Sequence, residues 1–308
     1  MPRILIADKL HSAFREKAEK LGYDVDDCPA YTRAETLAAI KDYEGLAIRT
    51  KFNIDRELME AGTRLKFIAR AGAGMDNIDE KFAEERGIIC INAPEGNRDA
   101  VGEHAVGMLL SLMNNLRKAD NEVRHEIWDR EGNRGYELKN RTVGIIGYGH
   151  MGQSFARKLR GFDVNIIAYD KYKTAFGDEY VKEVSMEEIV KESDVLSLHI
   201  PLTRETRQMV DDEYFFHFRK PVFFLNTARG EIVNTSSVLR AINSGKVLGA
   251  GLDVLESEKF PALAEQPWFE ELIANGKIIL SPHVAGWTFE SYRKISEVLG
   301  EKLASISL

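Results

Sequence analysis

Residues 142–152 read Thr-Val-Gly-Ile-Ile-Gly-Tyr-Gly-His-Met-Gly, and this stretch decides the fold of the chain. It holds a G-x-G-x-x-G motif directly after an apolar strand pattern and directly before an amphipathic helical pattern. In that setting the first glycine permits a tight turn, the second lets backbone N–H groups approach a pyrophosphate, and the third lets helix and strand pack closely. We therefore predict a dinucleotide-binding loop formed by Gly147, Gly149, His150, Met151 and Gly152.

A carboxylate follows the motif at the place where dinucleotide binding requires one. The next predicted strand, Val164–Tyr169, runs directly into Asp170, 18 residues after Gly152. A carboxylate there accepts hydrogen bonds from both hydroxyls of the adenosine ribose and repels a 2′-phosphate. The expected cofactor is therefore NAD, although Lys171 and Lys173 stand close enough to weaken the discrimination against NADP.

Apolar strand patterns alternate with amphipathic helical patterns on both sides of the motif, which is typical of an α/β fold with parallel sheets. The strands predicted before it are Arg3–Ala7, Leu46–Arg49, Lys66–Arg70 and Ile88–Asn92, and those from it onward are Thr142–Gly147, Val164–Tyr169, Asp194–Ile200, Val222–Asn226, Val247–Val254 and Lys277–Ser281. We predict two doubly wound parallel-sheet domains. A Rossmann NAD-binding domain (residues 99–287) is inserted into a flavodoxin-like substrate domain (residues 1–98 and 288–308). One long helix is expected from Asp99 to His125.

Composition narrows the class of protein. The 308 residues carry a formal net charge of −7, without a run of Lys or Arg that would follow a nucleic acid or an anionic membrane. The two cysteines lack the spacing of a zinc site, so no metal is expected. The N-terminus shows no signal pattern, and no apolar run has membrane-spanning length. A cytoplasmic protein without nucleic-acid or membrane partners is the expectation.

Three polar side chains follow predicted strands of the second domain and suit hydride chemistry on a hydroxy acid. Such a reaction needs a cation for the carboxylate, a base for the hydroxyl proton, and a group that orients the base. Arg229 follows Val222–Asn226 and offers a guanidinium that binds a carboxylate through two hydrogen bonds. His283 and Glu258 follow later strands, and a Glu–His pair raises the pKa of the imidazole.

Taken together, these motifs resemble the D-isomer-specific 2-hydroxyacid dehydrogenase family over nearly the whole chain and in the family's order. The matching segments are Gly147–Gly152 with Asp170, Leu198–Thr203, Asn226–Gly230, Gly251–Val254 and Ser281–Gly286. The resemblance implies that Arg229 binds the substrate, that His283 is the acid/base and that Glu258, rather than Glu256, pairs with it. Lys259 replaces a proline common in the family, which leaves the path of this loop open. The resemblance also implies cofactor contacts at Pro201, Thr227, Asp253 and Gly286.

The first domain contains a second anion-binding pattern. Residues 71–74 read Ala-Gly-Ala-Gly, a loop able to present backbone N–H groups to an anion. The resemblance implies that Gly72, Ala73 and Gly74 hold the substrate carboxylate in this way.

The identity of the substrate depends on three arginines, Arg49, Arg70 and Arg130. Three arginines are more than one carboxylate requires. In the phosphoglycerate dehydrogenase branch, arginines similar to them bind the 3-phosphate, and the one similar to Arg130 reaches across a homodimer. The expected reaction interconverts 3-phosphoglycerate and 3-phosphohydroxypyruvate. A glyoxylate or hydroxypyruvate reductase is the alternative enzyme, and a noncatalytic NAD-sensing scaffold is the alternative of another class. The predicted long helix resembles the family's dimerisation element.

Overall fold

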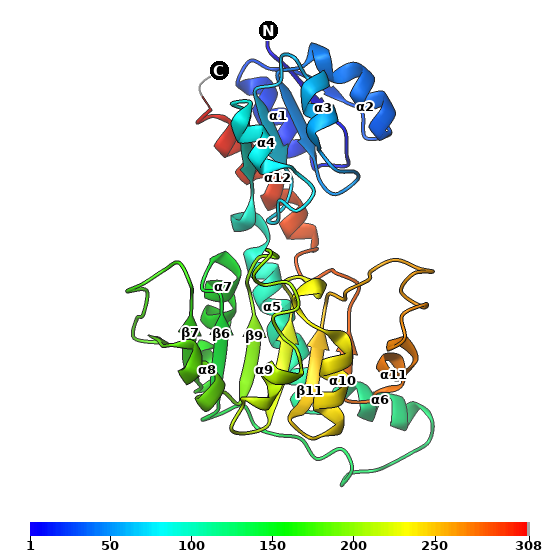
Figure 1. Ribbon diagram of the computed structural model, residues 1–308, viewed down its shortest axis with the longest axis vertical. Coiled ribbons are helices and arrows are strands. Elements are labelled where there is room, and N and C mark those ends of the chain that lie inside the picture. The colour runs from blue at the N-terminus through cyan, green and yellow to red at the C-terminus, as the bar shows by residue number, and fades with distance from the viewer. Residues whose placement is uncertain (307–308) are drawn as a thin grey trace. The chain divides into compact units, whose positions relative to one another are not determined.

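The computed structural model describes residues 1–306, so positions 307 and 308 of the predicted C-terminal segment lie outside the described residues. The chain divides into two compact units, and Figure 1 labels helices of each. Unit 1 comprises Met1–Arg98 with Trp287–Leu308, and unit 2 comprises Asp99–Gly286. Among the described residues no helix is both long and apolar enough to cross a membrane.

Unit 1 is built on a five-stranded parallel sheet of order β2-β1-β3-β4-β5, the flavodoxin-like order. Its strands are β1 (Arg3–Ile6), β2 (Asp24–Asp27), β3 (Gly45–Ile48), β4 (Phe67–Arg70) and β5 (Ile89–Asn92), and its helices are α1 (Ser12–Lys20), α2 (Arg33–Ala39), α3 (Arg56–Ala61), α4 (Glu80–Glu85) and α12 (Phe289–Leu303). Helix α12 packs against α1, where Leu299 and Phe14 are fully buried in one apolar cluster. The last helix of the chain thereby completes the core of unit 1.

Unit 2 is built on a seven-stranded parallel sheet of order β12-β11-β10-β9-β6-β7-β8. Its strands are β6 (Thr142–Ile146), β7 (Asn165–Tyr169), β8 (Val181–Glu183), β9 (Val195–Leu198), β10 (Val222–Asn226), β11 (Val247–Leu252) and β12 (Ile278–Leu280). The chain winds outward from β6 in both directions, which is the Rossmann arrangement. The predicted α/β fold with two doubly wound parallel sheets is confirmed.

Helices cover both faces of the unit 2 sheet, and two apolar clusters form its core. The helices are α5 (Pro94–Met113), which begins in unit 1, α6 (Leu116–Arg124), α7 (His150–Leu159), α8 (Met186–Glu192), α9 (Asp212–Phe216), α10 (Thr235–Asn243) and α11 (Phe269–Ala274). Strands β9 and β10 are buried at every position. Such continuous burial explains why the sequence shows apolar runs rather than alternation, because a parallel sheet is covered on both faces.

The prediction of one long helix from Asp99 to His125 is wrong. Helix α5 ends at Met113 and α6 begins at Leu116, with Asn115 between them in the left-handed region at φ 52°. Asparagine adopts this conformation more readily than most residues because its short polar side chain bonds locally, so Asn114-Asn115 ends the first helix. None of the residues of α6 is buried within the chain.

Candidate active site

The glycine loop has the geometry that a bound pyrophosphate requires. Gly147 lies at φ +90°, and a Cβ on Gly152 would stand 2.1 Å from the carbonyl oxygen of Gly147, so helix α7 packs directly on the turn. A Cβ on Gly149, by contrast, would meet no atom within 4 Å. The second glycine therefore faces open space at the N-terminus of α7, where His150 and Met151 begin the helix. The loop fits a dinucleotide phosphate.

Asp170 follows β7 and has a structural role that the sequence did not reveal. Its Oδ2 accepts a hydrogen bond from the Tyr148 N–H at 2.8 Å, and its Oδ1 accepts from the N–H groups of Tyr172 at 2.9 Å and Lys173 at 3.1 Å. A carboxylate has about four acceptor positions, so at least one remains for a ribose hydroxyl. The nearby lysines are engaged: Lys171 pairs with Glu205, and Lys173 donates to the Tyr148 carbonyl.

Other predicted cofactor residues lie at the same carboxyl edge of the unit 2 sheet. Thr227 directly follows β10, and its hydroxyl is buried without a hydrogen-bond partner among the described residues. Pro201 is exposed three residues after β9. The Thr227 hydroxyl lies at the same edge of the sheet as the glycine loop, and a buried hydroxyl without a protein partner fits a hydrogen-bonding ligand such as the cofactor.

His283 and Glu258 form the pair that the sequence predicts. The Nδ1 of His283 lies 2.9 Å from Oε2 of Glu258, and each side chain is partly exposed. The hydrogen bond to Glu258 raises the pKa of His283 above its ordinary value, while partial burial and the charge of Arg229 oppose that rise. Because Nδ1 is engaged with the carboxylate, Nε2 is the nitrogen left to exchange a proton with a substrate.

The backbone at His283 is held by the buried carboxylate of Asp253, which is only 2% exposed. Its Oδ1 accepts from the Ser281 hydroxyl at 2.6 Å and the Val284 N–H at 2.9 Å, and its Oδ2 accepts from the Ala285 N–H at 2.9 Å. The N–H of His283 donates to the Asp253 carbonyl at 2.7 Å. These bonds stabilise the left-handed conformation of His283, φ 55°, which is uncommon outside glycine. The cofactor contact expected of Asp253 stays a prediction.

His104 is a member of this group that sequence analysis missed. Its Nε2 lies 2.9 Å from the hydroxyl of Ser281. Since that hydroxyl donates to Asp253, it accepts from His104, and this fixes the proton of a neutral His104 on Nε2. The only signal in the sequence is a histidine within the predicted helix, directly after Glu103, and it does not identify a partner 177 positions away.

Arg229 is positioned by a tight turn after β10. The side chain of Asn226 donates to the Arg229 carbonyl at 2.9 Å and accepts from the Ala228 N–H at 3.0 Å. One guanidinium nitrogen of Arg229 donates to the Ala228 carbonyl at 2.6 Å. Arg229, Glu258 and His283 follow β10, β11 and β12, which are neighbouring strands of the unit 2 sheet, and the charge of Arg229 acts to lower the pKa of His283.

In unit 1 the predicted anion-binding residues also meet. Ile48 pairs with Arg70 in the β3–β4 register, so Arg49 and Arg70 lie at the ends of neighbouring strands. The guanidinium of Arg70 lies against Gly72, where a Cβ would stand 1.7 Å from its Nη1. No hydrogen bond among the described residues uses the N–H groups of Ala73 and Gly74.

Arg49 has an environment unusual for a surface arginine. Its guanidinium lies over the ring of Trp287, 3.8 Å from the centroid, and donates no hydrogen bond within the described chain. Burial lowers the pKa of Arg49 from its ordinary value, a sign that its charge is costly to hold there. Arg130, in contrast, is exposed and belongs to unit 2, whereas Arg49 and Arg70 belong to unit 1.

Comparison with known proteins adds to this geometry. Residues 106–285 match the family model "D-isomer specific 2-hydroxyacid dehydrogenase, NAD binding domain". The D-3-phosphoglycerate dehydrogenase of Archaeoglobus fulgidus is 31% identical over 99% of this chain and 57% of its own length. The hydroxypyruvate reductase of Thermotoga maritima is 35% identical over 87% of this chain and 86% of its own length. A solved glyoxylate reductase from Paecilomyes thermophila superposes with a TM-score of 0.87 at 27% identity, covering 99% of this chain and 94% of the other.

Unit 2 thus defines a nucleotide-binding α/β protein with a Glu–His pair at the carboxyl edge of its sheet. The chain belongs to the D-isomer specific 2-hydroxyacid dehydrogenase family, and the predicted family and NAD-binding domain are confirmed. The chain spans just over half the length of the curated phosphoglycerate dehydrogenases that it matches.

Replacing Glu258 by glutamine tests the cause of the raised pKa of His283. The amide removes the negative acceptor at Nδ1, so the pKa of His283 falls toward its ordinary value and the imidazole loses its proton at lower pH. Titration of the His283 ring by NMR measures the shift. Glu265→Gln, an exposed glutamate farther along the same loop, is the control and leaves the titration unchanged. An unaltered His283 titration in Glu258→Gln contradicts the assignment.

Proposed function

We propose that this chain is an NAD-dependent dehydrogenase that interconverts a D-2-hydroxy acid and its 2-oxo acid. The observation that carries the proposal is the His283–Glu258 pair beside Arg229 at the carboxyl edge of an NAD-binding domain. Doubly wound sheets bind their ligands at this edge, and the three side chains supply an acid/base, its orienting group and a carboxylate-binding cation.

The chemistry follows from the protonation state of His283. When bound, NADH supplies the hydride that C2 of the oxo acid accepts. Protonated His283 donates its Nε2 proton to the substrate oxygen, which becomes the hydroxyl, and the neutral imidazole accepts that proton back in the oxidative direction. Glu258 stabilises the imidazolium through Nδ1, and the guanidinium of Arg229 binds the carboxylate in a fixed orientation.

For the substrate we propose 3-phosphoglycerate and 3-phosphohydroxypyruvate. The support is the pair of arginines at adjacent strand ends of unit 1, one of them desolvated against Trp287. They lie next to the loop whose Ala73 and Gly74 N–H groups donate no hydrogen bond among the described residues. A dianionic phosphate suits guanidinium groups of this kind. The phosphoglycerate dehydrogenases among the relatives match nearly all of this chain.

A glyoxylate or hydroxypyruvate reductase is the second candidate. The hydroxypyruvate reductase of Thermotoga maritima shares more identity with this chain than the phosphoglycerate dehydrogenases above do. Its match also covers similar fractions of this chain and of its own length. A substrate without phosphate would leave Arg49 and Arg70 with a structural role only.

We propose further that the chain forms a homodimer through α6 and the segment after it. Four large apolar side chains are exposed there, and no residue of α6 is buried within the chain. They are Leu116, Val123, Ile127 and Trp128. An amphipathic helix whose apolar side finds no cover in its own chain is a candidate for contact with a second copy.

Light scattering of the purified protein tests the dimer. We expect twice the mass of one chain, and we expect Trp128→Ser with Val123→Ser to shift the equilibrium toward the monomer. Phe216→Ser, which removes an equally exposed aromatic side chain elsewhere in unit 2, is the control and retains the dimer. A monomeric parent protein would refute the proposal.

Replacing His283 by alanine tests the acid/base. Turnover with the best substrate is expected to fall roughly 10²- to 10⁴-fold, the usual contribution of one general acid. Binding of NADH, followed by fluorescence, remains unchanged because the glycine loop and Asp170 are intact. Near-normal turnover in His283→Ala would exclude the proposed role.

A substrate comparison separates the two enzyme candidates. NADH oxidation is measured with 3-phosphohydroxypyruvate, hydroxypyruvate, glyoxylate and pyruvate, and the phosphorylated acid is expected to give the highest kcat/KM. Arg49→Ala and Arg70→Ala should each lower that value roughly 10- to 100-fold, as for the loss of a charged hydrogen bond, with little effect on glyoxylate. Arg86→Ala, an exposed arginine of unit 1, is the control. If the unphosphorylated acids give an equal kcat/KM, the reductase is favoured. If none of the four acids is turned over, a noncatalytic NAD-binding role is favoured.

A further inference from the structure

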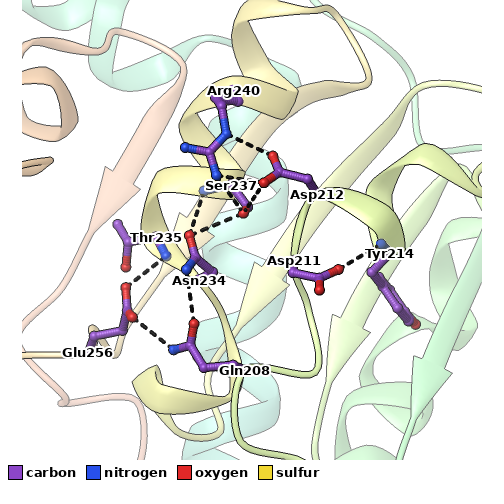
Figure 2. A network of polar contacts seen from close by, with 9 residues as sticks. All are labelled: Gln208, Asp211, Asp212, Tyr214, Asn234, Thr235, Ser237, Arg240 and Glu256. Carbon is purple, nitrogen blue, oxygen red and sulfur yellow. Dashed lines mark hydrogen bonds and ion pairs between the residues drawn. The ribbon is translucent and has the colours of Figure 1, made fainter.

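Glu256 stands two residues before Glu258 and makes contacts of its own. Its Oε2 accepts a hydrogen bond from the N–H of Thr235, the first residue of α10, at 2.8 Å. Its Oε1 accepts from the side-chain amide of Gln208, also at 2.8 Å. Figure 2 shows both carboxylate oxygens of Glu256 engaged in this way. One side chain therefore ties the loop after β11 to the start of α10 and to the segment before α9.

The partners of Glu256 are themselves fixed. The Oε1 of Gln208 accepts from the side chain of Asn234 at 2.9 Å, and the Gln208 N–H donates to the Glu231 carbonyl at 2.8 Å. Asn234 caps α10 by accepting from the Ser237 N–H at 2.9 Å. We call Glu256, Gln208 and Asn234 the Glu256 network (Figure 2). Each of its side-chain amides has one defined orientation, because every donor in it faces an acceptor.

This network adjoins the turn that bears Arg229. A Cβ on Gly230 would stand 1.9 Å from the Leu255 carbonyl oxygen and 2.7 Å from the Glu256 nitrogen, so the backbone after Arg229 lies directly on the backbone of the loop. Thr235 and Asn234 follow the same turn within a few residues. Holding Glu256 therefore fixes the loop at the point where it passes Arg229 and continues to Glu258.

We propose that Glu256 is a positioning residue for the reaction: its two hydrogen bonds hold the loop against the turn that bears Arg229, so that Glu258 reaches His283. The kinetic part of this proposal rests on the proposed function. The Glu256 carboxylate itself touches neither the imidazole nor the guanidinium in the contacts of the described residues, so it acts through the loop. It also places a negative charge at the N-terminus of α10, where the helix dipole favours it.

Three variants test the network. Glu256→Ala removes both hydrogen bonds. Glu256→Gln keeps the size of the side chain but replaces one carboxylate oxygen by an N–H₂ group. That N–H₂ group then faces the N–H₂ group of Gln208. If Gln208 reverses its amide, the two facing N–H₂ groups are instead those of Gln208 and Asn234. In the double variant Glu256→Gln with Gln208→Glu, which we call the exchanged pair, every donor again faces an acceptor. The glutamate at position 208 accepts from both Asn234 and the glutamine at position 256.

Two readouts are measured for each variant: the NMR titration of His283 and the steady-state kinetics with the best oxo acid. In Glu256→Ala the pKa of His283 should fall and kcat should drop roughly 10- to 100-fold, the scale of a small displacement of catalytic groups, while the KM for NADH is unchanged. Glu256→Gln should show the same changes in smaller measure, and the exchanged pair should recover both. The charged groups that act on His283, namely Glu258, Arg229 and Asp253, are retained in every variant.

The control is Glu271→Ala, which removes a carboxylate that accepts from Asn243 at the other end of α10. It should leave both readouts at the parent values, and thermal unfolding verifies that all variants fold. An unchanged His283 titration in Glu256→Ala, or an exchanged pair no better than Glu256→Gln, overturns the proposal. If the parent protein turns over none of the acids, the proposed function fails, and the titrations still decide whether Glu256 positions the pair.

Discussion

The arrangement of the active site depends on the hydrogen bonds of one buried carboxylate. Asp253 is removed from water, and an ionised group in that position is tolerated only when donors replace its solvation. Ser281, Val284 and Ala285 supply those donors, and they flank the histidine whose backbone is turned to a positive φ. The requirement of Asp253 for donors and the requirement of His283 for an uncommon conformation are met by the same few bonds.

The parallel sheet makes this arrangement possible because it collects loops from distant parts of the chain at one edge. Arg229 follows β10, Asp253 and Glu258 follow β11, and His283 follows β12, and these three strands are neighbours. Each loop then bonds to the next: Gly230 lies on the loop of Glu258, and Asp253 holds the turn of His283. These contacts link the loops that carry the site to one another.

The sequence carried the features that are local or periodic. The glycine motif and apolar runs predicted both sheets, although β2 (Asp-Val-Asp-Asp) and β8 (Val-Lys-Glu) were missed because short polar edge strands have no apolar run. The break at Asn115 went unnoticed because apolar spacing continues across it. The resemblance to the family implied that Glu258, rather than Glu256, pairs with His283, and the structure places Glu258 within hydrogen-bond distance of that histidine. The bonds of Asp253, His104 and Glu256 could not be predicted, since each depends on a partner brought close only by the tertiary fold.

Asp170 carries a consequence for attempts to redesign the coenzyme preference. The usual strategy replaces such an acid with a small or basic residue so that a 2′-phosphate is accepted. Here the carboxylate also accepts from the backbone of Tyr148, inside the glycine motif, and from Tyr172 and Lys173. Substitution would leave these donors without their acceptor and loosen the turn of the glycine motif. The recognition of the ribose expected of Asp170 and the hydrogen bonding of the glycine loop therefore depend on one side chain, and a switch of coenzyme requires both to be rebuilt together.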